Sequence, residues 1–354
     1  MAPVRKAAKP GEFIPVSEDQ VKGIGGKIMS RDPEGRSTAV FLTRFLSFFG
    51  VDPAVVVQVW DMLEVPFVDP FGDLNGAQPK HLLWALLFLR KYGDESEMAA
   101  LVGDKGTAVD EKTFRKWRKI FVQCIAFLKY RVVSLFSASS FVQAVATSDC
   151  CFTSLIACFR LSLLQIIWEN QKVGDQGNDC LTSVDCTDVP IPYQTSGSIP
   201  EAWYTKKFNA SGLRYEIGVC ILTGWIVWLM GPFPCGDWPD IVCFRYALKH
   251  MLDDGERVEA DDGYVGEDPA SVKVPGSVLH DQDPQMLRVR SRVRRRHEGV
   301  NKLIKQFKVV GKATIFRHDL SFHGACFTAC TILTQLQIEN GHPLYDIGVY
   351  YDPA

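Results

Sequence analysis

The sequence predicts a mixed α/β protein, in which helices pack on a sheet and a helical region precedes it. Residues 37–134 repeat apolar side chains with helical period, whereas from Asp179 onward the order becomes strand, hairpin, helix, strand and long helix. Hydrophobic residues make up 47% of the 354 residues and charged residues 23%, so most of the chain is expected to fold around buried cores.

The N-terminal residues 1–36 are rich in Pro, Gly, Lys and Asp and lack periodicity, which predicts a disordered tail. Residues 1–11 have no apolar core of the kind found in a secretory signal. The 11 cysteines form no CxxC pair, so neither a zinc ribbon nor a disulfide framework is indicated. His323, Cys326 and Cys330 can share a helix face, but they lack an evident fourth zinc ligand. Reduced thiols in an intracellular protein are the simplest expectation.

Residues 37–131 are expected to be helical. Helices are predicted at 37–49, 53–63, 81–92, 95–102 and from 110 onward, with Gly50, Gly93 and Gly103 as stops and Asp110 as a cap. The last three resemble a helix-turn-helix, and basic side chains lie near the start of the final helix: Lys112, Arg115, Lys116, Arg118 and Lys119. The alternative is an ordinary helical bundle with a solvated basic face.

Residues 132–165 are compositionally unlike their surroundings. They contain only two charged side chains, Asp149 and Arg160, and no clean helical or strand period. One interpretation is an apolar insertion packed on the domain, and the one we favour is a translated intron or another gene-model artefact. The apolar run at 151–168 is interrupted by Arg160 and makes a poor membrane span, so no membrane partner is expected.

The second half of the chain carries strand and helix signals in alternation. A strand is predicted at 180–189, a hairpin at 214–230 with Gly224 at its turn, a helix from Asp240, a strand at 257–260, a basic helix at 285–307, a short strand near 314–316 and a last helix at 324–340.

Three carboxylates fall at the ends of these elements or within the basic helix. Asp185 lies on the first strand, Asp261 follows the strand at 257–260 just before Gly263, and Glu298 lies in the basic helix. Such a set suits two-metal phosphoryl transfer, because Mg²⁺ prefers carboxylate and water oxygens. Each acid also has a structural alternative: Asp185 and Asp261 as turn residues, and Glu298 as a partner of nearby arginines.

A basic run surrounds Glu298, although the net charge of the chain is only −2. We expect these side chains to hold DNA phosphates; the alternative is a solvated helix face. The residues are Arg290, Arg292, Arg294, Arg295, Arg296, Lys302 and Lys305.

Several motifs together resemble the DDE superfamily endonuclease of PIF/Harbinger-type transposases, a group allied to IS5-like bacterial elements. Residues 183–188 (SVDCTD) are similar to the family's V-D-G-T, 231–240 to its G-x-x-P-G-x-x-x-D, 260–264 (ADDGY) to A-D-x-G-Y, and 293–298 (VRRRHE) to R-x-E. Residues 262–297 separate Asp261 from Glu298, a spacing that suits the family, and the resemblance covers roughly residues 170–352.

The resemblance implies an RNase H-like fold in residues 166–354, with Asp185, Asp261 and Glu298 as both catalytic and metal-binding residues. It implies a divalent cation (Mg²⁺ or Mn²⁺) and transposon-end and target DNA as substrates. It also implies a nuclear location, with a separate DNA-binding protein or a second copy of the chain as partners. Asp188 and Asp262 are competitors for the acidic positions. Asp240, an acid at a helix start, either faces the site or caps its helix, and we favour the cap. Cys186 replaces the family's glycine and adds a side chain beside the first acid.

The alternative function is a transposase-derived DNA-binding protein without catalysis. The three acids argue against it, whereas Cys186 and the unusual segment at 132–165 argue for it. A membrane-associated protein is the weakest alternative.

Overall fold

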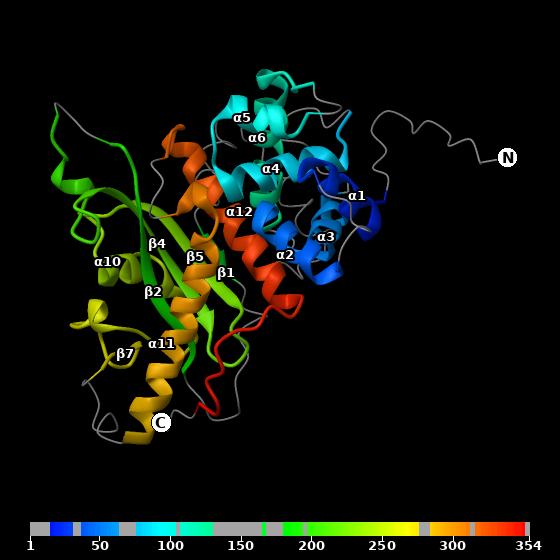
Figure 1. The fold of residues 1–354 in the computed structure, drawn as a ribbon. Coiled ribbons are helices and arrows are strands. Elements are labelled where there is room, and N and C mark those ends of the chain that lie inside the picture. The colour runs from blue at the N-terminus through cyan, green and yellow to red at the C-terminus, as the bar shows by residue number, and fades with distance from the viewer. Residues whose placement is uncertain are drawn as a thin grey trace, which may run out of the picture. The chain divides into compact units, whose positions relative to one another are not determined.

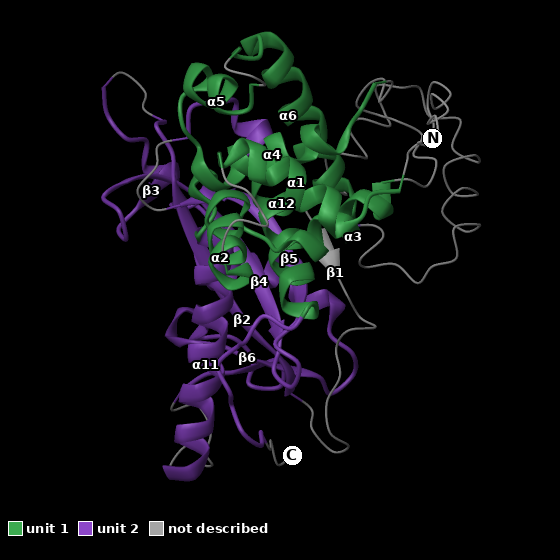
Figure 2. Cartoon of the chain, turned by 45° about the vertical axis from the view of Figure 1, so that its right-hand side comes forward, with its two compact units in different colours: residues 1–128, 306–309, 325–340 green, residues 129–305, 310–324, 341–354 purple. Residues whose placement is uncertain are grey.

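The structure is a computed structural model that describes residues 15–30, 37–63, 76–103, 107–129, 165–167, 180–193, 197–275, 284–311 and 316–350. The segment predicted to be anomalous, 132–165, lies outside these residues except for Gln165, and most of the predicted strand near 314–316 does as well. The chain divides into two compact units (Figure 2): residues 1–128, 306–309 and 325–340 form unit 1, and residues 129–305, 310–324 and 341–354 form unit 2.

Unit 1 is helical, as predicted for this half of the chain. Its helices are α1 (Glu18–Ile28), α2 (Thr38–Phe49), α3 (Pro53–Leu63), α4 (Pro79–Lys91), α5 (Glu95–Leu101), α6 (Glu111–Phe127) and most of α12 (Leu320–Glu339). The signals at the helix ends act as expected: Asp110 accepts a hydrogen bond from the Thr113 amide, and Gly50 ends α2 at φ 81°. A Cβ at Gly50 would also meet the Phe307 ring at 2.3 Å, so only glycine fits there.

Helix α1 corrects the predicted disordered tail. Ser17 and Gln20 form a reciprocal capping box, and Val21 and Ile28 are buried. Gly25 lies so close to Phe45 that an added Cβ would be 2.4 Å from its ring. The helix is short and glycine-rich, which hides its period in the sequence, but it forms because its apolar side packs in unit 1.

Unit 2 is built on a mixed sheet (Figure 1). Its strands are β1 (Gln165–Ile167), β2 (Cys180–Pro190), β3 (Tyr204–Thr205), β4 (Ala210–Cys220), β5 (Ile226–Pro234), β6 (Arg257–Glu259) and β7 (Val272–Lys273). The order across the sheet is β1-β5-β4-β2-β6-β7, with β3 pairing β4 outside this path. Strands β2, β4 and β5 are antiparallel neighbours, whereas β6 runs parallel to β2 and β7 parallel to β6. This topology confirms the predicted mixed α/β class and is consistent with an RNase H-like fold.

Two helices cover opposite faces of β2. Val184 and Cys186 point into a core shared with Phe244 of α10 (Asp240–Tyr246), whereas Ser183 and Asp185 contact α11 (Pro284–Lys305). Alternate residues of a strand face opposite sides, so the sequence of β2 assigns one side to the core and the other to polar contacts. In Figure 1, α11 runs beside β2.

Among the described residues, no single helix is long and apolar enough to span a membrane. Helices α2 and α3 meet that criterion only as a pair, and they are bent by 51° at their junction.

Candidate active site

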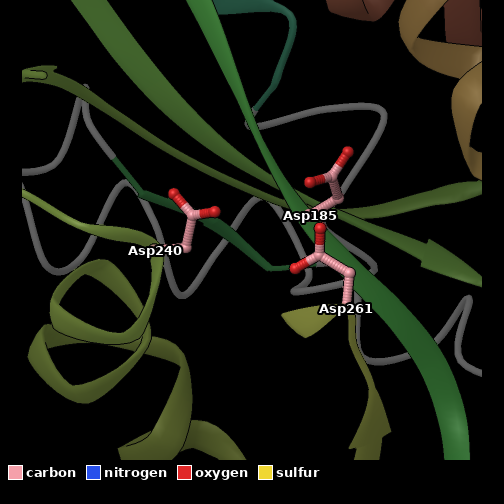
Figure 3. Close-up of side chains that lie close together, drawn as sticks. All are labelled: Asp185, Asp240 and Asp261. Atoms are coloured by element: carbon pink, nitrogen blue, oxygen red, sulfur yellow. The ribbon is translucent and has the colours of Figure 1, made fainter. Parts of the chain in front are cut away.

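The register of two parallel strands brings Asp185 and Asp261 together. Ser183 of β2 pairs with Glu259 of β6. Asp185 follows Ser183 by two residues, and Asp261 follows Glu259 by two residues. Because β2 and β6 are parallel neighbours, the two aspartates lie at the same level along the strand direction. Figure 3 shows the two side chains close together.

Asp240 is the third member of this acidic cluster. It is the first residue of α10, and carboxylate oxygens of Asp185, Asp240 and Asp261 all lie within 4.8 Å of one another (Figure 3). The preferred expectation, that Asp240 caps its helix with a hydrogen bond, gives way to the alternative that it faces the site, because the N-cap residue of α10 is Pro239. Asp240 accepts a hydrogen bond from Arg214, at 2.5 Å, and joins the cluster.

The turn after β6 leaves room for these carboxylates because residue 263 is glycine. The Gly263 amide donates a hydrogen bond of 2.9 Å to Oδ1 of Asp261. A Cβ at this position would lie 2.6 Å from Oδ2 of Asp240 and 3.0 Å from Oδ1 of Asp261. Its φ is not left-handed, so the need for glycine here is one of space.

The cluster concentrates negative charge in a partly buried place. Burial, followed by the charges of Asp261 and Asp240, raises the pKa of Asp185 to about 7. Lys207 opposes this rise. Burial also raises the pKa of Asp240, against the opposing charge of Arg214. Three carboxylates held this close together repel one another unless a proton or a cation lies between them.

Arg214 fixes the outer side of the cluster. Its guanidinium binds both carboxylate oxygens of Asp188, at 2.8 and 3.0 Å, and Asp240 on the helix. Thr205 donates a further hydrogen bond to Asp188 at 2.7 Å. Burial alone would raise the pKa of Asp188, but the hydrogen bonds and charge of Arg214 hold it below its usual value. Asp188 therefore serves as the counter-ion of Arg214. Asp262, the other alternative candidate for an acidic position of the site, is exposed in the turn after β6.

Cys186, the departure from the family pattern, points to the other face of β2 from Asp185, and its thiol lies beside Asp240, where its hydrogen bond opposes the rise in the pKa of that carboxyl. It is 7% exposed and belongs to the core cluster, with its Sγ 3.7 Å from the Tyr264 hydroxyl. Beneath it, Glu216 accepts hydrogen bonds from Trp228 and Tyr264. Burial raises the pKa of Glu216 to about 8, so this carboxyl is largely neutral at pH 7.

Glu298 lies in α11 with an exposed side chain and is not one of the three clustered acids. Its neighbour one turn later does reach the site: Asn301 donates a hydrogen bond of 3.1 Å from Nδ2 to Oδ2 of Asp185. Asn301 was not predicted from the sequence, and for Asp240 a place in the site was only the second alternative. The spacing of Asn301 from Glu298, three residues on a helix, is the signal that places it on nearly the same face.

The basic residues of α11 differ in their burial and in the groups that they contact. Arg290 is 1% exposed and pairs with the buried Glu259 at 3.1 Å, so its guanidinium is not on the surface where DNA contacts were expected. Arg296 donates to the carbonyl oxygens of Tyr345, Ile221 and Leu222, and Arg292 to that of Ile347 at 3.5 Å. Lys305 donates to the Asp188 carbonyl, Arg294 is half-buried, and Arg295 and Lys302 are exposed.

Comparison with known proteins gives one match. Residues 184–335 match the family model of the DDE superfamily endonuclease. The matched segment contains Asp185, Asp240 and Asp261, and it supports the superfamily that the sequence motifs resemble. No curated protein and no solved structure matches the chain.

Proposed function

We propose that this protein is a metal-dependent DNA endonuclease of the transposase type. The observation that carries the proposal is the cluster of Asp185, Asp240 and Asp261, whose oxygens lie within 4.8 Å of one another inside the segment that matches the endonuclease family. The cluster is built on adjacent parallel strands of a sheet with RNase H-like topology.

The donor set fits a hard divalent cation. All three groups offer carboxylate oxygens, the ligands that Mg²⁺ and Mn²⁺ prefer. Burial is the main cause of the raised pKa of Asp185, and the negative charges of Asp261 and Asp240 add to it. A bound divalent cation supplies positive charge that activates a water nucleophile and stabilises the leaving oxygen of a phosphodiester. The chain's own part is to hold Asp185 and Asp261 in register, to fix Asp240 through Arg214, and to keep residue 263 free of a side chain.

Cations near the cluster support DNA as the substrate. Lys207 is exposed and close enough to the acids to lower the pKa of Asp185. Exposed Arg295 and Lys302 on α11 are suited to phosphate contacts, as are half-buried Arg294 and Lys305. We do not include Arg290, because its guanidinium is buried against Glu259.

The finer assignments are proposals as well. Within the superfamily, the four motifs favour the PIF/Harbinger type, and with it strand transfer to target DNA by the 3′-hydroxyl after cutting, residence in the nucleus, and a partner that is either a separate DNA-binding protein or a second copy of the chain. Asp185 and Asp261 are the first two catalytic and metal-binding acids. Glu298 remains our proposal for the catalytic acid from α11, and Asp240 is a further candidate ligand.

A nicking assay on supercoiled DNA, with Mg²⁺, Mn²⁺ or EDTA, tests the proposal. We expect metal-dependent cutting that Asp261→Ala abolishes. Asp240→Asn and Glu298→Gln then identify the third acid: the variant that loses cutting by about a hundredfold or more lacks a group that acts in the transition state. Unchanged cutting in Asp261→Ala would refute the site. DNA binding without cutting in either metal would favour the non-catalytic alternative.

A further inference from the structure

Helix α11 is joined to β2 by polar contacts at three successive turns. The Nδ1 of His297 lies 2.9 Å from the Ser183 hydroxyl, Asn301 donates to Asp185, and Lys305 donates to the Asp188 carbonyl at 2.9 Å. Four residues of an α-helix rise about 6 Å and two residues of a strand about 6.6 Å, which matches the step from Ser183 to Asp185. The step from Asp185 to Asp188 is three residues, about 10 Å, and there the contact is made by the long side chain of Lys305. The middle contact is the one that reaches the acidic cluster.

Asn301 and His297 each keep a buried polar atom without a hydrogen-bond partner among the described residues, Oδ1 and Nε2 respectively, but of the two only Asn301 contacts the acidic cluster. The Asn301 side chain is 9% exposed. Leaving a buried amide oxygen without a partner costs about 1–3 kcal/mol, so such an atom calls for an explanation. A site that receives a ligand only when it functions provides one.

The orientation of the amide follows from its neighbour. The Asn301 Nδ2 donates to Oδ2 of Asp185, so Oδ1 is the atom of the amide that remains. An amide oxygen is a hard, neutral ligand of the kind that Mg²⁺ and Mn²⁺ accept beside carboxylates. A neutral donor adds no negative charge to a cluster that already holds three acids.

We propose that Asn301 is part of the ion site: its Nδ2 positions the Asp185 carboxylate and its Oδ1 is a neutral oxygen donor for the divalent cation. This inference rests on the ion site of the proposed function and adds to it a residue of α11 outside the acidic cluster. It makes α11 responsible for the geometry of the ion site as well as for binding DNA.

The test is Mn²⁺ binding, measured by titration calorimetry and by the ion-induced rise in melting temperature, on the full chain without DNA. Asn301→Leu keeps the size of the side chain but removes both polar atoms. We expect it to weaken Mn²⁺ binding by about 10- to 100-fold, the range typical for residues that orient metal ligands. Thr182→Val is the matched control. Thr182 lies on β2, the strand of Asp185, and its buried hydroxyl oxygen also has no hydrogen-bond partner among the described residues, so its removal should leave Mn²⁺ affinity unchanged.

Asn301→Asp separates participation in the site from a purely structural role. The added carboxylate should lower the melting temperature without ion, through repulsion with Asp185. It should also give a larger Mn²⁺-induced rise than in the unaltered chain, because it provides one more charged ligand. An Mn²⁺ affinity unchanged in Asn301→Leu, or an ion-induced rise in Asn301→Asp no larger than that of the unaltered chain, overturns the inference while leaving the proposed function standing. Absence of Mn²⁺ binding in the unaltered chain overturns both.

Discussion

At the scale of single residues, the carboxylate of Asp185 carries the main electrostatic cost of the site. Its pKa is about 7 in the fold, against 3.8 when unperturbed, so between these values the folded state binds more protons than the unfolded state. Without metal, this group therefore lowers stability progressively as the pH rises from about 4 to about 7. The full effect has an upper limit of roughly 4 kcal/mol, at about 1.4 kcal/mol per pKa unit.

Replacing Asp185 by asparagine tests this sign. In EDTA, we expect Asp185→Asn to melt at a higher temperature than the unaltered chain at pH 8, with a smaller difference at pH 5 and little at pH 4. Added Mg²⁺ should stabilise the unaltered chain and leave the variant unchanged. Thermal melts at the three pH values measure both effects, and a difference that does not grow with pH would contradict the raised pKa.

Gly263 allows a second test at this scale, because a methyl group there competes with the acids for space. The added Cβ of Gly263→Ala would lie 2.6 Å from Asp240 and 3.0 Å from Asp261, so one carboxylate must move. We expect ion affinity and cutting to fall by about tenfold or more, since the donor positions of such a site must be held within about 0.5 Å.

Gly299→Ala is the control for this substitution. Gly299 lies in α11 with nothing within 4 Å of an added Cβ, so alanine should stabilise the helix by up to about 1 kcal/mol and leave the site intact. Equal activity of the two variants would show that the carboxylates of Asp240 and Asp261 do not need the space that glycine leaves at position 263.

The residues of the site differ in how readily they can be predicted from the sequence. Asp261 follows a short strand and lies two residues before Gly263, a pattern that marks an acid where a strand ends in a turn. Asp240 opens a helix after Pro239, where capping is the commoner role, and only the position of α10 relative to β2 draws it into the cluster. Arg290 belongs to a basic run in the sequence, but the run does not reveal that Glu259 on β6 lies beside it.

At the scale of elements, the arginines of α11 divide into those that bond within the fold and those that are exposed, for which we propose contacts with DNA. Arg296 is half-buried and donates to three backbone carbonyls of unit 2, whereas Arg295 is exposed and contacts the Tyr345 hydroxyl at 3.2 Å. A periodic basic pattern cannot separate these roles, because both residues are arginine and adjacent.

Paired substitutions should separate them. Arg296→Gln is expected to destabilise the protein by about 1.5–3 kcal/mol, the usual value of hydrogen bonds to a charged group. Arg295→Gln should leave stability within about 0.5 kcal/mol and reduce the salt dependence of DNA binding by about one ion. Denaturant melts and DNA titrations at several salt concentrations measure the two quantities. Loss of DNA affinity without loss of stability in Arg296→Gln would reverse this assignment.

The elements themselves were predictable where local signals are strong. Helices α2 to α6 and strands β2, β4, β5 and β6 appear close to their expected positions, because Gly50, Pro53 and Asp110 fix helix ends and Gly224 fixes the hairpin turn. Strands β3 and β7 have two residues each, too few for a period, and form only by pairing with an existing sheet. The capping box of α1 was visible as Ser17 and Gln20, but no apolar period accompanied it.

At the scale of the whole molecule, the chain places acids in one unit and a second basic surface in the other. The C-terminal helix α12 contributes residues to both units, so the division does not follow the order of the chain. In unit 1, Lys112, Lys116 and Lys119 are exposed on one side of α6, while Arg118 is buried and paired with Glu95. The packing thus leaves lysines, and not this arginine, for an external partner.

This surface supports the interpretation of unit 1 as a DNA-binding region. The triple substitution of Lys112, Lys116 and Lys119 by glutamine is expected to weaken DNA binding without altering Mn²⁺ affinity, since none of these residues belongs to the ion site. If all three lysines neutralise phosphates, removing their charges should make the slope of log affinity against log salt less steep by about 3, because each neutralised phosphate releases about 0.9 counterion. Lys27→Gln, an exposed lysine of α1, is the control and should change the slope little. An unchanged slope in the triple variant would mean that the basic side of α6 is a solvated surface and that DNA is held by unit 2 alone.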